Sequence, residues 1–315
     1  MFLQFTKSIQ IKLNARNSIL LALLALLLFN ACTDSGPVDP PDGHVGDGNM
    51  YIRIIDVGQA SSALITTPDG YHLLYDFATG TAATSYILPL LDSLGIDFVD
   101  MAIASHFDGD HISGSDEVLE VIDLDGYCYD HGGTYTTNNF LEYEEAVGDK
   151  RRTMNFGDTL YLGNDGVRIA CMASGGNGTF VIQENDKSVG CIISWKGFDV
   201  WIGGDINGSD EGERVDMEGR IADAMPMIEF YVANHHGSRY SSSETFLDAL
   251  RPDFCAISCG YENPYGHPHS ETLARLAVWT SEIYRTDLSG TITVIVDDDG
   301  SYSISTEDGS YYEVF

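Results

Sequence analysis

A mostly apolar run at residues 98–104 passes directly into the segment SHFDGDH at residues 105–111. The run predicts a buried β-strand, and loops that follow strands are where functional sites are usually built. Imidazoles and carboxylates that alternate within one short loop can surround a cation. The alternative is a solvated turn that happens to contain these residue types. The loop predicts a metal site whose ligands are His106, Asp108, Asp110 and His111.

Three further clusters follow strand-like runs and extend the candidate site. The segment WIGGD ends in Asp205, behind two glycines that let the backbone approach an ion closely. The segments NHHGS at residues 234–238 and NPYGHPH at residues 263–269 hold four more histidines. Six of the nine histidines of the chain fall in the three clusters that contain histidine, which argues against isolated core histidines. The pattern adds these side chains as candidate ligands; the alternative for the segment that ends in Asp205 is an ordinary turn, in which Gly-Gly-Asp is also common.

Strand and helix signals surround these loops. Segments rich in β-branched and aromatic residues predict strands at 51–57, 62–67, 71–77, 190–195, 199–202, 228–233, 254–258, 291–296 and 302–306. Helical spacing of apolar residues predicts helices at 82–94, 116–122, 138–147, 210–224, 243–250 and 270–281. Strands and helices in both halves indicate two packed sheets with helices outside.

The order of these motifs resembles the metallo-β-lactamase superfamily, and within it the metallo-β-lactamase-like domain of ComEC-type DNA-uptake proteins. The resemblance extends over roughly residues 51–280. DVGQA at residues 56–60 is similar to that group's opening motif, and YDFATG at residues 75–80 is similar to the turn that follows. The later motifs are matched in order and spacing by residues 105–111, 185–188, 204–205, 235–238 and 265–268. The resemblance implies an α+β fold, a four-layer αβ/βα sandwich with a one- or two-metal centre at one edge.

Carried over residue by residue, the resemblance implies a place for each ligand. His106 and Asp108 would serve one metal, Asp110 and His111 the other, and Asp205 would bridge them. His235 is the expected closing ligand, and His236 is the alternative.

The sequence departs from the family's pattern twice. Asp108 stands where a second histidine is usual, and no histidine lies in residues 185–188, where a third normally sits. The first metal position is therefore weakened. It would be empty, or it would hold an ion that accepts more oxygen ligands, such as Mn²⁺ rather than Zn²⁺.

The expected chemistry follows from the cation. A bound divalent metal lowers the pKa of water from about 15.7 to about 7 and polarises the group under attack. Asp110 or Asp205 is expected to orient that water. His267 is expected to contact a substrate phosphate or to protonate a leaving group. The expected substrate contacts are His236, Ser238 and His269.

The N-terminus has the pattern of an export signal. Three basic residues precede an apolar run at residues 19–29, which spans about ten residues and is short of the roughly 20 that a transmembrane helix needs. Residues 1–31 are therefore predicted to be a signal peptide. Cys32 at its end resembles the lipidation site of bacterial lipoproteins; the alternative is an ordinary signal with an incidental cysteine. The expected location is extracytoplasmic and membrane-anchored, in the periplasm or on the cell surface of a bacterium.

Residues 32–49 are rich in Pro, Gly and Asp and predict a flexible acidic tether. Residues 50–315 are expected to form one hydrolase domain, since no second break of similar composition follows. Five cysteines remain beyond Cys32, an odd number, so at least one should stay unpaired. Cys255 and Cys259 lack metal-type spacing and are expected to be buried.

The net charge of the chain is −32, and removing the signal peptide would take away three positive charges and no negative ones. So acidic a surface argues against broad adhesion to nucleic acid, because that affinity depends largely on Lys and Arg. The basic triplet at residues 150–152 is read as a solvated strand edge, with a substrate-steering patch as the alternative.

A metal-dependent phosphodiesterase or nuclease is the leading hypothesis for the function, with a phosphodiester, possibly DNA, as the substrate and one or two Zn²⁺ or Mn²⁺ ions as cofactor. Hydrolysis of a small ester, lactone or β-lactam is the second hypothesis, because the fold hosts many reactions. A metal-poor surface lipoprotein that only binds is the third. No obligate protein partner is evident from the sequence.

Overall fold

A computed structural model describes residues 44–309 and 311–314 of the 315-residue chain. The predicted signal peptide, Cys32 and most of the predicted tether lie outside the described residues. The described residues from Val45 onward form one compact unit. The last residues of the predicted tether already pack on this unit, because the Gly48 N–H donates to the Pro68 carbonyl at 3.1 Å.

Sheet A is a mixed sheet of nine strands within the described residues, in the order β16-β15-β14-β1-β2-β3-β4-β5-β6. Strands β1, β2 and β3 form an antiparallel meander, and β3, β4, β5 and β6 run parallel. The C-terminal strands join the other side, where β1 pairs antiparallel with β14. The strands are β1 Met50–Ile54, β2 Ala63–Thr66, β3 His72–Tyr75, β4 Phe98–Ile103, β5 Asp123–Asp130, β6 Arg151–Thr153, β14 Ile292–Val296, β15 Tyr302–Thr306 and β16 Tyr311–Val314.

Sheet B has seven strands within the described residues, in the order β13-β12-β11-β10-β9-β8-β7. Strands β7 to β10 are antiparallel, and β10, β11, β12 and β13 run parallel. The strands are β7 Thr159–Leu162, β8 Val167–Ala173, β9 Gly190–Trp195, β10 Phe198–Ile202, β11 Phe230–Val232, β12 Phe254–Ile257 and β13 Ile283–Arg285.

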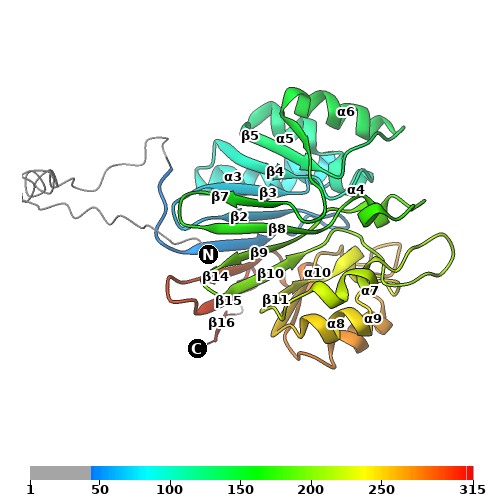
Figure 1. Cartoon of the computed structure of the whole chain (residues 1–315). Coiled ribbons are helices and arrows are strands. Elements are labelled where there is room, and N and C mark those ends of the chain that lie inside the picture. Colours follow the sequence, from blue (N-terminus) through cyan, green and yellow to red (C-terminus); the bar gives the residue numbers. More distant parts are fainter. Residues whose placement is uncertain (1–43, 310, 315) are drawn as a thin grey trace, which may run out of the picture. The chain divides into compact units, whose positions relative to one another are not determined.

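Three separate apolar clusters define four layers (Figure 1). Alternate residues of a strand point to opposite faces of its sheet, so Leu73 and Tyr75 join the cluster between the two sheets and Leu74 joins the cluster under the helices of sheet A. A third cluster lies between sheet B and its own helices. The predicted α+β, four-layer αβ/βα sandwich is therefore confirmed.

The helices cover the two outer faces. On sheet A lie α2 Gly80–Ala82, the π-helix η1 Ala83–Ile87, α3 Leu88–Leu94, α4 Gly109–Ile112, α5 Ser115–Val121 and α6 Asn138–Val147. On sheet B lie α7 Met217–Ile221, α8 Glu244–Leu250 and α9 Ser270–Leu276. The remaining helical segments are α10 Thr286–Ser289 and the 3₁₀ turns η2 Gly148–Lys150, η3 Gly175–Gly178, η4 Asn185–Lys187, η5 Ala222–Ala224 and η6 Asn234–Gly237.

The predicted helix at residues 210–224 is wrong in its first half. The helix begins only at Met217, because the Asp216 side chain accepts the Gly219 N–H at 2.7 Å and caps it there. Gly212, with φ 73°, lies in the irregular segment before it. No helix among the described residues is long and apolar enough to cross a bilayer.

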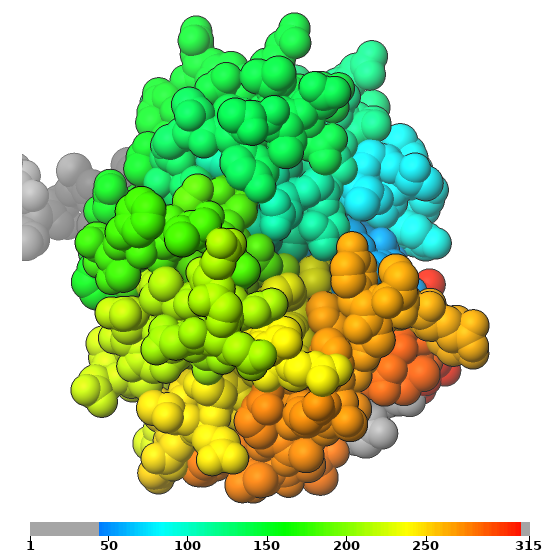
Figure 2. All heavy atoms as spheres, turned by 90° about the vertical axis from the view of Figure 1, so that its right-hand side faces the viewer, coloured from blue at the N-terminus to red at the C-terminus, as the bar shows by residue number. Residues whose placement is uncertain are grey.

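The parallel strands direct their carboxyl ends to one edge of the sandwich. The loops after β3, β4, β10, β11 and β12 all leave at this edge, where α4 is labelled in Figure 1. Figure 2 looks onto the same edge, and segments far apart in the sequence, coloured green, yellow and orange, meet on it. This edge contains all four motif clusters that the sequence singles out.

Candidate metal centre

His111 is held by a carboxylate that follows the neighbouring strand. The buried Asp76, one residue after β3, has its Oδ2 atom 2.7 Å from Nδ1 of His111. The same carboxylate accepts hydrogen bonds from the Ser105 N–H at 2.7 Å and the Ser105 hydroxyl at 3.0 Å. A carboxylate partner fixes the proton of His111 on Nδ1, which leaves the Nε2 lone pair free for a metal.

Ser105 orients His106 in the same sense. The Ser105 hydroxyl donates to Asp76, so it can accept from Nδ1 of His106, which lies 3.0 Å away. Nε2 of His106 is then the acceptor end of the ring and is buried. Ser105 and Asp76 thus orient both imidazoles of the loop after β4, so that each Nε2 atom faces the centre.

Asp205 enters the centre from sheet B behind two glycines that have no room for a side chain. A Cβ on Gly204 would lie 2.6 Å from Cβ of Ser105, and Gly204 has a φ of 56°. A Cβ on Gly203 would lie 2.4 Å from Oδ1 of Asn234. Because the glycines let the two sheets approach so closely, Oδ1 of Asp205 reaches to 3.3 Å from Nε2 of His111.

The turn after β11 supplies the closing imidazole, and its geometry favours His236 over His235. Nδ1 of His236 lies 2.9 Å from the Ser258 carbonyl, so Nε2 is the free end, and it lies 3.4 Å from Oδ2 of Asp110. In contrast, Nε2 of His235 faces the Asn185 side-chain amide at 3.3 Å. His235 stays beside the centre, with Nε2 3.6 Å from Oδ2 of Asp205.

A buried polar network fixes this turn. His235 and His236 both have a φ of 53°, a left-handed conformation that costs non-glycine residues free energy and persists only where the surroundings enforce it. The Asn234 side chain enforces it by accepting from Trp201 Nε1 at 2.9 Å and donating to Glu218 Oε1 at 2.7 Å. Burial raises the pKa of Glu218. Hydrogen bonds from Asn234, Ser242 and Ser243 lower this pKa but offset only part of the effect of burial.

Among the described residues, two overlapping groups bring ligand atoms close enough together to hold an ion. One group is His106, His111 and Asp205, and the other is Asp110, His111 and His236. Within each group the ligand atoms lie within 4.8 Å of one another. Nε2 of His106, of His111 and of His236 is buried without a hydrogen-bond partner in the described part of the chain. Buried polar atoms normally find partners, so these three orphaned lone pairs fit a divalent cation.

The charges of the centre are compatible with a bound cation. Burial raises the pKa of Asp205, but His235, His236 and His111 outweigh burial and bring it well below its usual value. Burial lowers the pKa of His111, but Asp205, Asp76 and Asp110 outweigh it and raise that pKa well above the usual value. Each acidic side chain is therefore stabilised by positive charge among the imidazoles, the role that a bound metal ion would take over.

Asp108 lies at the side of the centre, outside both groups. Its Oδ2 is 3.5 Å from Nε2 of His106, and its Oδ1 accepts from the Tyr135 hydroxyl at 3.4 Å. The side chain is 36% exposed, whereas His106 is fully buried. Asp108 therefore borders the centre beside His106, and its expected role as a ligand of the first metal stays a prediction.

His267 and His269 border the centre on the side of the loop after β12. The Gln59 side chain accepts the Gly260 N–H through Oε1, so its Nε2 faces Nδ1 of His267 at 3.4 Å. Burial, then the neighbouring His236 and His235, lower the pKa of His267 to about 3. His267 is therefore neutral at pH 7 with its proton on Nε2. This form suits contact with a substrate oxygen and not proton donation by an imidazolium.

Two expected substrate contacts serve the local structure instead of opening into the centre. The buried Ser238 hydroxyl accepts the Tyr240 N–H at 3.4 Å, and the Ser238 carbonyl accepts from Thr272. Nδ1 of His269 accepts the Arg239 N–H at 3.2 Å at the start of α9. His269 lies beside His267, with ring centroids 4.9 Å apart, and both residues are partly buried.

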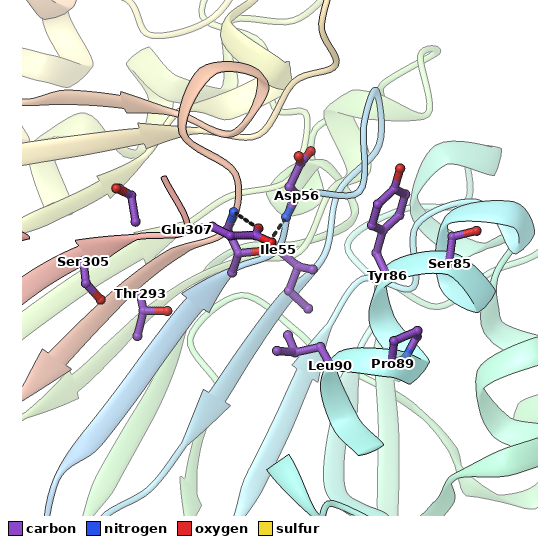
Figure 3. A pocket seen from close by; sticks show the side chains of 11 residues that line it. Ile55, Asp56, Ser85, Tyr86, Pro89, Leu90, Thr293, Ser305 and Glu307 are labelled. Atoms are coloured by element: carbon purple, nitrogen blue, oxygen red, sulfur yellow. Dashed lines mark hydrogen bonds between the residues drawn. The ribbon is translucent and has the colours of Figure 1, made fainter. Parts of the chain in front are cut away.

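Asp56 of the DVGQA segment does not reach the metal centre. It lines a separate hollow of about 530 Å³ between the end of β1, the helical segment η1–α3 and strands β14 and β15 (Figure 3). Its N–H donates to the Thr291 hydroxyl at 3.2 Å, and the Thr291 N–H donates to Glu307 at 3.1 Å. Within that segment it is Gln59 that contacts the centre.

Several functional residues were missed by the sequence analysis. Asp76 and Ser105 orient the ligands, Asn185 reaches Asp205 and His235 from the turn before β9, and Gln59 sets the tautomer of His267. Asp76 carried a usable signal, because it lies in the YDFATG segment that resembles a motif of the family. The other contacts join residues far apart in the chain.

The comparisons with known proteins agree with this geometry. Residues 55–254 match the family described as the metallo-beta-lactamase superfamily, which is more than half of the chain. The chain belongs to the metallo-β-lactamase superfamily. Metal-dependent hydrolysis is the general chemistry of this superfamily, and its fold binds divalent metal ions.

Among curated relatives, the chain is similar to two bacterial proteins, a competence protein and a recombination protein. It is 28% identical to Competence protein ComA of Neisseria gonorrhoeae over 249 residues, which cover 79% of this chain and 32% of that protein. It is 28% identical to Recombination protein 2 of Haemophilus influenzae over 254 residues, which cover 77% of this chain and 28% of that protein. The resemblance to ComEC-type proteins is thus confirmed, and the chain spans about a third of the length of these relatives.

A solved structure supports the fold alone. The diiron β-hydroxylase CmlA of Streptomyces venezuelae superposes with a TM-score of 0.50 at 13% identity, covering 78% of this chain and 53% of that one.

Replacing Gly204 by alanine tests the close approach of the two sheets. The left-handed φ should cost about 1–2 kcal/mol, and the contact with Ser105 should roughly double that loss, because Ser105 is held on Asp76 and cannot move freely. Gly197→Ala is the matched control, since its φ is 87° and nothing lies within 4 Å of its Cβ. Urea unfolding of both variants measures the difference. Equal losses would mean that Gly204 is needed for its backbone conformation alone.

Proposed function

We propose that this chain is a metal-dependent phosphodiesterase that acts on DNA or a chemically similar phosphodiester. The observation that carries the proposal is the convergence of three buried, unpartnered Nε2 atoms, of His106, His111 and His236, on the carboxylates Asp110 and Asp205. A divalent cation bound there would supply Lewis-acid polarisation and a lowered pKa for water. The names of two relatives, a competence protein and a recombination protein, favour DNA as the substrate.

The chain's own residues divide the remaining work. Asp110 is the ligand-group carboxylate that reaches solvent, with a side chain 34% exposed, so it is the carboxylate that can orient an attacking water. His267 presents its Nε2–H to a non-bridging phosphate oxygen. Asp76 and Ser105 do not contact the substrate. Their hydrogen bonds hold the imidazole rings of His106 and His111 in the orientation that metal binding needs.

The basic triplet at residues 150–152 is not assigned a role in substrate binding. Lys150 ends the turn η2, and Arg151 and Arg152 lie on β6, the edge strand of sheet A. Arg151 donates to Asp130 at 2.6 Å, and Lys150 donates to the Leu124 carbonyl. The guanidinium of Arg152 lies over the Tyr127 ring. These contacts support the solvated strand edge over the steering patch, so substrate affinity should depend on the metal centre more than on salt-sensitive contacts to phosphate.

Hydrolysis of bis-p-nitrophenyl phosphate and of single- and double-stranded DNA tests the proposal directly. The chain from residue 33 onward is loaded with Mn²⁺ or Zn²⁺, and its metal content is verified before the assay. We expect cleavage with at least one metal, and a KM that changes less than about tenfold between 50 and 200 mM salt, because few phosphate contacts are made by Lys or Arg.

The same assay compares phosphodiesters with a cephalosporin, a lactone and a carboxylic ester. Faster turnover of any of these than of the phosphodiesters would overturn the phosphodiesterase in favour of a small-molecule hydrolase. No turnover of any substrate by verified metal-loaded protein would favour a binding lipoprotein.

The location and partners belong to the same proposal. We retain the expected signal peptide, the lipid anchor on Cys32 and a site of action outside the cytoplasm, in contact with the membrane through that anchor. We also retain the expectation that the proposed reaction needs no obligate protein partner.

A further inference from the structure

Two buried thiols face each other on neighbouring strands of sheet B. Cys171 of β8 is the register partner of Cys191 of β9. Both have 0% exposure and belong to the apolar cluster between the two sheets. Register partners of an antiparallel pair present their side chains to the same face of the sheet, so the two sulfur atoms share one small volume of the core.

The backbone hydrogen bonds show which kind of antiparallel pair this is. The Cys171 N–H donates to the Asp158 carbonyl at 2.9 Å, and the Cys171 carbonyl accepts the Gly157 N–H at 2.9 Å. Both groups of Cys171 therefore point to the chain leading into β7 and away from β9. It follows that Cys171 and Cys191 form a non-hydrogen-bonded pair, the type in which opposite Cα atoms come to about 4.5 Å.

This spacing falls within the range of about 4.4–6.8 Å that a disulfide spans between Cα atoms. In the thiol form, Cys171 donates to the Ala173 carbonyl at 3.2 Å, and Cys191 contacts the Met154 sulfur at 3.8 Å. The other described cysteines have different neighbours: Cys128 contacts the Tyr143 hydroxyl, and Cys259 contacts Asp287.

We propose that Cys171 and Cys191 form a cross-strand disulfide when the chain folds in an oxidising compartment. The bond would link the two ends of the loop between β8 and β9, which carries Glu184 and Asn185. It would thereby restrict the movement of the segment from which Asn185 contacts Asp205 and His235. The proposal rests on the expected export of the chain and is independent of the proposed phosphodiesterase activity.

The chemistry balances with a disulfide donor, either a thiol–disulfide oxidoreductase or a small-molecule disulfide. One cysteine thiolate attacks the donor disulfide and releases a first donor thiol, and the second cysteine thiolate then attacks the mixed disulfide and releases the other. The two cysteines lose two protons and two electrons, and the donor disulfide is reduced to two thiols. Because neither sulfur is exposed in the folded chain, the exchange takes place before the core closes.

Peptide mapping tests the bond. The full chain is produced with its own signal in a bacterial host, isolated from the envelope fraction, and alkylated in denaturant without reductant. Trypsin cuts after Arg168, Lys187 and Lys196, which places the two cysteines on separate peptides, 169–187 and 188–196. We expect these peptides as one linked species, about 2 Da lighter than their sum because two hydrogens are lost.

A second measurement distinguishes a bond from mere proximity. Reductant should lower the Tm of the wild-type chain by about 5–10 °C and leave that of the double variant Cys171→Ala/Cys191→Ala unchanged. Cys128→Ser is the matched control and should keep both the linked peptide and the response. Recovery of both peptides fully alkylated, after isolation and again after refolding with oxidised glutathione, would overturn the proposal while leaving the hydrolase assay unaffected.

Discussion

Replacing His111 by alanine should remove hydrolysis by a factor of at least about 1,000, equivalent to roughly 4 kcal/mol of lost transition-state stabilisation. His111 is the one residue common to both candidate ligand groups, so its loss leaves neither of them complete. Metal bound per chain, measured after dialysis against buffer without chelator, should fall together with activity. The fold should survive, because alanine removes an orphaned polar atom from the core as well as a ligand.

His72→Ala is the matched control for this variant. His72 begins β3, three residues before the strand ends next to Asp76, and its ring contacts Thr66 at 3.2 Å. Its loss should leave metal content and turnover close to those of the wild type. If His111→Ala binds as much metal as His72→Ala, the centre described here is not the metal site.

Replacing Asp76 by asparagine should lower metal affinity and turnover by about 10–100-fold, the usual effect of removing the outer partner of a metal-bound histidine. Asparagine preserves the shape of the side chain but turns one acceptor oxygen into a donor. Asp76 accepts from Ser105 twice and faces Nδ1 of His111. At least one of these contacts must break, and the free imidazole can then change its tautomer or rotate. Isothermal titration with Zn²⁺ or Mn²⁺ measures the loss.

Asp56→Asn serves as the control for Asp76→Asn. Both aspartates lie in motifs near the start of the domain, but Asp56 lines the separate hollow and has no contact with the ligand groups (Figure 3). Its variant should bind metal like the wild type. The positioning role of Asp76 would be contradicted if Asp76→Asn kept wild-type affinity, or if excess metal failed to restore any of its lost turnover.

The metal loop was predictable because its signal is local. His106, Asp110 and His111 lie within six residues, and the apolar run before them predicts the strand that they follow. Asp205 was predictable for a related reason, since two glycines in front of a carboxylate at a strand end serve a close approach. The sandwich followed from alternating strand and helix signals combined with the family resemblance.

Other parts depended on contacts that no local pattern contains. The choice between His235 and His236 depends on the Ser258 carbonyl, which anchors one ring, and on the Asn185 amide, which engages the other. The tautomer of His267 depends on Gln59, more than 200 residues away in the chain. Strand β5 escaped prediction because it follows α5 at once and its outer positions are exposed, which leaves it without a continuous apolar run.

The pairing of β1 with β14 has a consequence for biosynthesis. Met50 lies opposite Val296, so the first strand of the domain is completed by one of the last, and the segment matched by the family ends well before that partner. Contacts of such long sequence separation slow folding, since the intervening chain must be brought together first. A nascent chain that lacks its final strands would carry β1 as an open apolar edge prone to self-association. Chaperoning in the cell is therefore most needed between the emergence of β1 and that of β14.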